Sequence, residues 1–303
     1  MKRAVDQILV DPLELDELRG VELIFSGFDR QANGGALTAG YELAPWLEDF
    51  RLFITYTLEN VVTQAQPGTQ QVLANQFQSG VTSSVRLSFN YDKRDNRLFP
   101  TAGFLSSASA EFASSIFGSQ NLFQRYRLIQ RYYHPLIWGL VFKSNVSLGY
   151  IRSTDPLNHP VAISEKFFEG GINSIRGYVL RSISPTLKIA TTREPNSATL
   201  DFPVGGNKEL ITNWEIEFPI VESAGVRGVV FYDAGNVFSE KENFFQSAQR
   251  GGNLPLGLFH SVGAGLRWFS PLGPLRFEVG FPLTRRPSVD DPYLFEFTIG
   301  NFF

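Results

Sequence analysis

The feature that most constrains this chain is a strict alternation of apolar and polar residues in segments of roughly 9 to 12 residues, the length that a tilted strand needs to cross a lipid bilayer. In residues 210–218, Leu210 and Trp214 fall on one face, whereas Glu215 and Glu217 fall on the other. The same pattern occurs in residues 51–58, 85–92 and 140–150. Because successive side chains of a strand point to opposite faces, a period of two predicts long β-strands.

Alternation alone also fits a water-soluble sandwich, so two further observations decide between the two classes. Polar faces carry charged residues and glycine in mid-strand, as in Arg267 of one segment and Arg276, Glu278 and Gly280 of the next, which is typical of a wet barrel lumen. Apolar faces begin or end in rings such as Tyr150 and Trp268, which is typical of aromatic girdles at the two membrane interfaces. Aromatic residues make up 14% of the chain, with 28 Phe. No run of about 18 apolar residues occurs, which excludes helical spans.

These observations predict an all-β protein, an antiparallel transmembrane β-barrel in which about 12 strands are legible. An even number of strands permits closure. Residues 1–19 lack the alternation and are expected to form a lead-in that is partly helical or irregular, followed by the barrel over residues 20–303. A connection from about 152 to 207 is too long for a hairpin and is expected to be a functional loop folded into the lumen. The strands are expected to begin near residues 20, 35, 49, 84, 104, 122, 139, 208, 226, 260, 274 and 293.

Composition and motifs argue against several other classes of function. The chain has no cysteine and three histidines in no metal-ligand spacing, so we expect no metal site and no cofactor. No nucleophile motif or phosphate-binding loop occurs, so we expect no catalytic residues and no enzyme activity. A net charge of −3 with scattered Lys and Arg predicts no binding of nucleic acid. Met1 is followed by no apolar segment of a signal peptide, so an export signal is expected upstream.

The long connection contains the motif FFEGGINSIRGY at residues 167–178. Its paired glycines permit tight turns, and Arg176 places five donors at the tip of such a turn. Carboxylates on lumen-facing positions of two later strands, Glu215 with Glu217 and Asp233, could bind this guanidinium if the loop enters the lumen. Such a charge-assisted pair contributes about 1.5 to 3 kcal/mol.

The tetrapeptide Ile175, Arg176, Gly177, Tyr178 after FFEGG resembles the loop signature of the BamA family of outer-membrane assembly factors. YDKRDNRLFPTAGF at 91–104 is similar to a second motif of that family, and YDAGNVF at 232–238 to a third. SPLGPLRFE at 270–278 and the closing FEFTIGNFF add two more matches in the same order. The resemblance implies that the loop arginine lies inside the lumen against an acidic residue on each of two neighbouring strands, which are Glu217 and Asp233 here.

The family resemblance also implies a function and partners. Such a barrel lies in the bacterial outer membrane, contacts its lipids, and folds and inserts unfolded outer-membrane proteins through a weakly paired seam. Upstream POTRA domains, absent here, would connect it to periplasmic assembly lipoproteins. The last strand, with Phe295, Phe297, Ile299 and Phe303 on one face, is then the signal by which the barrel itself is recognised for insertion.

Several alternatives stay open at this point. The family barrel has sixteen strands, so the chain is either a C-terminal portion or a smaller complete barrel whose seam joins the strands near 20 and 293. Two-partner secretion pores share the loop motif but export a passenger protein. A truncated remnant without activity is a third interpretation, and the substrate range, the oligomeric state and the role of residues 1–19 are open.

Overall fold

The computed structural model describes residues 16–25, 28–42, 49–65, 79–190, 199–247, 249, 253–270, 273–286 and 289–299. In this part of the chain, a sheet of twelve antiparallel strands is accompanied by one separate hairpin. Most of the expected lead-in, and Phe303, lie outside the described residues. The short 3-10 turns are η1 (Ser115–Phe117), η2 (Ile137–Gly139), η3 (Ile163–Glu165), η4 (Glu222–Ala224) and η6 (Pro255–Gly257). None of the described helices is long and apolar enough to cross a membrane.

The twelve strands follow one another around the sheet in chain order, so every neighbour in the sequence is a neighbour in space. They are β1 (Asp16–Phe25), β2 (Phe28–Glu42), β3 (Phe50–Ala65), β4 (Gly80–Asp92), β5 (Gly103–Ala113), β6 (Phe123–Pro135), β7 (Val141–Ser153), β10 (Lys208–Val221), β11 (Val226–Phe238), β12 (Phe259–Ser270), β13 (Gly273–Pro282) and β14 (Leu294–Ile299). Strands β8 (Thr186–Ala190) and β9 (Thr199–Pro203) form the separate hairpin, which belongs to the long connection between β7 and β10.

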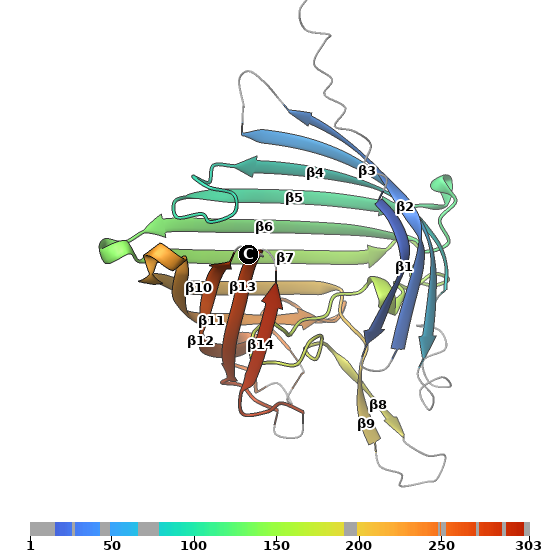
Figure 1. Cartoon of the computed structure of the whole chain (residues 1–303). Helices are drawn as coiled ribbons and strands as arrows, with labels where there is room; N and C mark the ends of the chain where they lie inside the picture. Colours follow the sequence, from blue (N-terminus) through green and yellow to red (C-terminus); the bar gives the residue numbers. More distant parts are fainter. Residues whose placement is uncertain are drawn as a thin grey trace, which may run out of the picture.

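The sheet curls into a barrel wall that is open on one side, with β1 in dark blue and β14 in red at its two edges (Figure 1). The predicted all-β antiparallel barrel architecture is confirmed. The described residues form no ladder between β1 and β14, so the seam considered for a small closed barrel is not present there. The number of strands sets the diameter of a closed barrel. A sheet of twelve strands that curves less strongly than a closed twelve-stranded barrel therefore leaves a gap between its two edge strands.

Polar side chains point into the barrel and apolar ones point out, the reverse of a water-soluble protein. On β10, Glu215 and Glu217 are each 1% exposed, whereas Trp214, next to Glu215 in the chain, is 50% exposed. Burying an ionised carboxylate costs so much free energy that each one must be paired with a cation inside the barrel. Aromatic rings that point outward are suited to contact with lipid. The exposed outer face also carries Leu37, Ile54, Phe89, Leu128, Leu148, Val230, Leu266, Phe281, Phe295 and Ile299.

The two ends of the barrel differ in the length of their connections. Only four residues lie between β10 and β11, and β12 is followed almost at once by β13, whereas residues 154–207 join β7 to β10 at the other end. The long connection therefore enters the lumen from the end that carries the long loops.

The strand boundaries differ from the sequence-based expectation mainly at the first two strands. Strand β1 begins at Asp16, inside the expected lead-in of residues 1–19. Strand β2 begins at Phe28 rather than near 35. The expected start was too late because residues 33–35 show no apolar alternation, although their backbone still pairs with β3, as in Gly34 opposite Glu59. A side-chain pattern cannot detect a strand whose residues have no apolar side chains.

Candidate functional site

The FFEGG segment of the long connection is held in shape by backbone hydrogen bonds to other residues of the same connection. Glu169 and Ile183 exchange N–H···O bonds of 2.9 and 2.8 Å. Gly170 and Gly171 follow with φ of 108° and 94°, a region that side chains other than hydrogen rarely tolerate. The N–H of Gly171 then donates to the carbonyl of Tyr178 at 2.9 Å. The segment is thereby closed into a compact turn that presents Arg176.

Arg176 is the centre of this site, at 1% exposure. Its Nε and Nη2 donate to the two carboxylate oxygens of Asp233 at 2.7 and 2.6 Å, and its backbone N–H adds a 3.1 Å bond to Oδ2. Its Nη1 donates to Glu215 at 2.5 Å and to Glu278 at 3.1 Å. The guanidinium carbon lies 3.5 Å from the centroid of the Phe231 ring. Bidentate pairing and ring stacking are geometries that arginine supplies and lysine does not.

Two further arginines complete the charge balance of the buried cluster. Arg267, fully buried, donates to both oxygens of Glu215 at 2.7 and 2.8 Å and to Glu278 at 2.9 Å. Arg276 donates to Glu278 from Nε and Nη2 at 3.0 and 2.8 Å. Burial alone would lower the pKa of Arg176, but the Asp233 and Glu215 carboxylates raise it well above its ordinary value. The two carboxylates therefore favour the charged form of the Arg176 guanidinium.

The expected pairing of Arg176 with Asp233 occurs, but the expected pairing with Glu217 is replaced by Glu215. Glu217 instead binds Lys143 at 2.7 Å, Arg227 at 2.9 Å and Arg267 at 3.2 Å. Both glutamates face the lumen, about 7 Å apart along the strand. The alternation in the sequence could not determine which of the two lies level with the loop arginine.

The other residues of the IRGY tetrapeptide are also buried against the barrel wall. Tyr178, fully buried, donates its hydroxyl to the carbonyl of His260 at 2.9 Å and lies 2.8 Å from the hydroxyl of Thr284. Ile175 is fully buried as well, in one apolar cluster with Tyr178 and Phe259. The tetrapeptide thus binds the wall through an ion-pair face and an apolar face together.

Glu278, Arg267 and Arg276 were expected on the lumen face but were not identified as partners of the loop. The available signal was their alternate position on two adjacent strands, and that position is correct: Gly265 pairs with Glu278 and Arg267 with Arg276 in the ladder of β12 and β13. Glu278 binds Arg176 and Arg276 donates to the carbonyl of Ile172, and these contacts with a loop about one hundred residues earlier have no counterpart in the local pattern. Arg267 binds two of the same carboxylates, those of Glu215 and Glu278.

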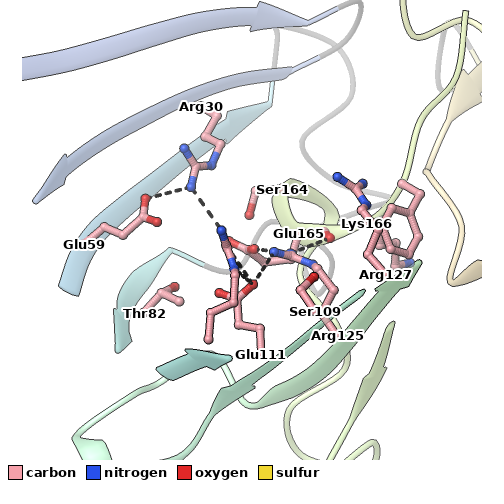
Figure 2. Close-up of a pocket in the computed structure, with 12 residues that line it drawn as sticks. Arg30, Glu59, Thr82, Ser109, Glu111, Arg125, Arg127, Ser164, Glu165 and Lys166 are labelled. Atoms are coloured by element: carbon pink, nitrogen blue, oxygen red, sulfur yellow. Dashed lines mark hydrogen bonds and ion pairs between the residues drawn. The ribbon is translucent and has the colours of Figure 1, made fainter. Parts of the chain in front are cut away.

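A second ion-pair cluster fixes the first half of the long connection (Figure 2). Arg125 on β6 binds Glu111 on β5 at 3.1 Å and Glu165 of η3 at 2.6 Å. Arg30 on β2 binds Glu59 at 2.9 Å and lies 3.8 Å from Glu165. These side chains line a pocket of about 290 Å³ between η3 and the barrel wall. The loop is therefore attached at two separate places, one against β5 and β6 and the other against β10, β11 and β13.

The β4–β5 turn, which carries the YDKRDNRLFPTAGF motif, is organised around Asp95. Its Oδ1 accepts hydrogen bonds from the N–H groups of Thr101 and Ala102 at 2.9 and 3.1 Å. The Phe99 ring lies 3.8 Å, centroid to centroid, from the ring of Phe269 on β12. Since β4 and β12 are far apart in the sheet order, this turn reaches across the short-turn end of the barrel.

The last strand presents Phe295, Phe297 and Ile299 on the outer face, with exposures of 62%, 50% and 63%. These three share one face, as the alternation indicates, while Phe303 lies outside the described residues. Their role as an insertion signal stays a prediction. In the part of the chain that the structure describes, no group of His, Asp or Glu side chains is arranged to hold a metal ion.

Comparison with known proteins places these features in one family. Residues 24–303 match the model of the Omp85 superfamily domain. The outer membrane protein assembly factor BamA of Nitratidesulfovibrio vulgaris is 31% identical over 224 residues, which is 74% of this chain and 26% of that protein. BamA of Neisseria meningitidis serogroup B is 29% identical over 234 residues, 70% of this chain and 28% of that protein. The chain thus spans about a quarter of the length of these relatives.

Solved structures show the same barrel fold. BamA from Haemophilus ducreyi lacking POTRA domains 1–3 superposes with a TM-score of 0.70 at 22% identity, covering 88% of this chain and 54% of that one. CdiB from Escherichia coli superposes with a TM-score of 0.56 at 14% identity, covering 92% of this chain and 47% of that one. At these identities the likeness establishes the fold alone.

Proposed function

The chain belongs to the Omp85 superfamily as a BamA-type member, and we propose that it forms the membrane-embedded part of a machine that folds and inserts outer-membrane proteins. Its partners are then unfolded outer-membrane proteins and outer-membrane lipids, together with periplasmic assembly lipoproteins. The outward apolar face supports a location in the outer membrane, because it buries in lipid at low cost while the charged face stays in the lumen.

The observation that carries this proposal is the anchoring of Arg176 to Asp233 inside the barrel. Bidentate ion pairs hold this loop in a fixed position inside the lumen, where it fills the interior with paired polar groups. Leaving one buried carboxylate without its arginine would cost about 3 to 5 kcal/mol, so the loop is not easily expelled to clear a passage. Among the described residues, the second edge of β14 has no strand beside it. Such an edge can pair with an incoming strand by adding it to the sheet.

The test is a folding assay with the full chain refolded into liposomes of outer-membrane-type lipids. A urea-unfolded eight-stranded barrel protein is added, and its folding is followed by the gel shift between heated and unheated samples. We expect faster folding than in liposomes that contain an unrelated barrel of similar mass. Equal folding rates in the two kinds of liposome would contradict the proposal.

Protein export is the alternative outcome of the same experiment. An export pore requires a lumen that opens, so it predicts ion conductance across a planar bilayer that Arg176→Ala increases strongly, without faster folding of a barrel client. The assembly function predicts folding activity at low conductance. Measuring both quantities on one preparation separates the two functions.

A further inference from the structure

A recess in the lumen face of strands β3 to β6, next to the β4–β5 turn, carries a cluster of arginines. These strands lie side by side in the wall (Figure 1). The recess has a volume of about 340 Å³, roughly that of ten water molecules in the liquid. Its lining includes four arginines against a single aspartate: Arg51, Arg94, Arg97, Arg131 and Asp92. A concave site with this imbalance of charge attracts anions.

The strand ladders bring these side chains to one face of the sheet. Arg51 of β3 is opposite Asn90 of β4. Two residues further along β4, Asp92 is opposite Leu105 of β5, and Leu105 is opposite Arg131 of β6. Residues two apart on a strand point to the same side, as do their partners across the ladder. Arg51 and Arg131 are three strand spacings apart, about 14 Å, which two extended arginine side chains and one small anion can bridge.

The single aspartate of the recess is already bound. Asp92 accepts hydrogen bonds from Nε and Nη2 of Arg94 at 2.8 and 2.9 Å, one on each carboxylate oxygen. Nε of Arg97 lies 3.6 Å from the same carboxylate. The two oxygens of Asp92 are therefore occupied by the arginines of the turn and not by Arg131 on β6.

Arg131 has no carboxylate partner in the part of the chain that the structure describes. Its Nε donates to Oδ1 of Asn145 at 3.4 Å, a long hydrogen bond to a neutral amide. Its titratable neighbours are the guanidinium of Arg94 and the neutral hydroxyl of Tyr133. A partly buried guanidinium without a counter-charge is costly. An anion bound in a bidentate manner to its Nη1–Nη2 edge would supply that charge.

A neutral donor lies beside the arginines. The hydroxyl of Ser107 donates to Oδ1 of Asn90 at 2.6 Å, and both residues line the recess. This bond uses the oxygen of the amide and leaves Nδ2, which can only donate, for another partner. The remaining lining is apolar and adds no acceptor: Phe53, Leu105 and Ile129. The recess is therefore rich in donors and poor in acceptors.

We propose that this recess binds a phosphate group, with Arg131 as its bidentate donor and the other arginines of the lining, together with Asn90, as further donors. A phosphomonoester carries up to two negative charges and several acceptor oxygens, so it matches several arginines better than a carboxylate does. The phosphate is a free anion or the headgroup of an anionic lipid, and the two present the same chemistry. The site is separate from the ion pairs of Arg176 and does not depend on the function proposed above.

The experiment measures protection of Arg131 from phenylglyoxal, a reagent that modifies arginine, in the full chain refolded in phosphate-free detergent solution. Mass spectrometry after digestion locates the modified residues. We expect inorganic phosphate at about ten times its Kd to slow modification of Arg131 about tenfold, because the reagent attacks only the unoccupied fraction. Sodium chloride at equal ionic strength should have little effect, since it only screens charge.

Variants test the same site by affinity, measured from the broadening of the ³¹P resonance of inorganic phosphate. Arg131→Gln should weaken binding about tenfold or more, the loss of one charge-assisted pair. Arg131→Lys keeps the charge but loses the planar edge, so an intermediate affinity is expected. Arg86→Gln is the matched control, because this arginine of β4 binds Glu111 in the recess beside η3, and it should bind phosphate like the parent chain. The gel shift on heating shows whether each variant has a folded barrel.

Liposomes distinguish the two sources of phosphate. The chain is refolded into phosphatidylcholine with or without phosphatidic acid, whose headgroup is a phosphomonoester. Protection of Arg131 by inorganic phosphate in pure phosphatidylcholine identifies the free anion as the ligand. Protection that requires phosphatidic acid identifies the lipid headgroup. Either result supports the site.

The proposal fails if neither source of phosphate protects Arg131 more than sodium chloride does. It also fails if Arg131→Gln, with a folded barrel, binds phosphate as tightly as the parent chain, or if Arg86→Gln loses binding to the same extent. Protection by a glutamate-rich peptide, but by neither source of phosphate, would assign the recess to acidic protein segments and contradict the proposal.

Discussion

Gly177 of the lumenal loop and Gly280 of β13 meet backbone to backbone. A Cβ built on Gly280 would lie 2.4 Å from the backbone nitrogen of Gly177, and one built on Gly177 would lie 2.8 Å from the carbonyl carbon of Gly280. Gly177 also has φ of 84°, which favours glycine for a second reason. The depth to which Arg176 enters the lumen depends on two residues that have no side chain.

Gly280→Ala should therefore push the loop away from the barrel wall. We expect a loss of about 1 to 3 kcal/mol, typical of overpacking, because the atoms that obstruct the new methyl group are backbone. The measurement is the urea midpoint of the full chain together with cleavage of the loop by proteinase K. Gly35→Ala is the control, since nothing lies within 4 Å of a Cβ at that position. Equal behaviour of the two variants would show that the close approach has no energetic importance.

Arg176→Ala should release the loop while the barrel still forms. Removing the guanidinium leaves Asp233, Glu215 and Glu278 short of a buried partner, a loss of about 3 to 5 kcal/mol. Arg176→Lys keeps the charge but loses the bidentate bond, so an intermediate effect is expected. Loop cleavage by proteinase K measures the release, and the gel shift on heating reports the barrel. Arg152→Ala, at an exposed arginine bonded to Gln124, should leave the loop protected.

Glu215 and Glu217 should differ in their coupling to Arg176. In double-mutant cycles, Arg176→Ala with Glu215→Gln should show a coupling energy of about 0.5 to 3 kcal/mol, because the two side chains share a hydrogen bond. The cycle with Glu217→Gln should give a smaller value, since the partners of Glu217 are Lys143, Arg227 and Arg267. Free energies of unfolding of the four proteins in each cycle provide the measurement. A larger coupling to Glu217 than to Glu215 would contradict the geometry.

The β4–β5 turn should weaken in acid. Burial raises the pKa of Asp95, but the hydroxyl of Thr101 and the N–H groups of Ala102 and Thr101 more than offset this and hold it below its ordinary value. A carboxyl group with a lowered pKa stabilises the folded turn above its unfolded pKa, and this contribution is lost as the pH falls through the folded pKa. Hydrogen exchange of residues 95–102 should therefore accelerate on acidification relative to the strand amides. In Asp95→Ala, exchange should be fast at every pH, and a slow turn in this variant would contradict the prediction.

How far the sequence determines this protein is best seen at Glu215 and Glu278. Their alternate positions within polar and apolar runs place both on the lumen face, and the same pattern gives the twelve strands of the wall and the long connection between β7 and β10. A period of two is a local property, because each residue is assigned a face by its immediate neighbours. No homologous structure is required for that step.

Only the tertiary structure decided which carboxylates bind Arg176. The register of β10 against β11 sets Asn213 opposite Asp233 and so brings Asp233 and Glu215 level with the loop, leaving Glu217 to other cations. Strand register is fixed by the pairing of whole strands, and the depth of the loop by its contact with Gly280 on a strand about one hundred residues later. The sequence by itself determined which side chains face the lumen, whereas long-range pairing determined which of them touch.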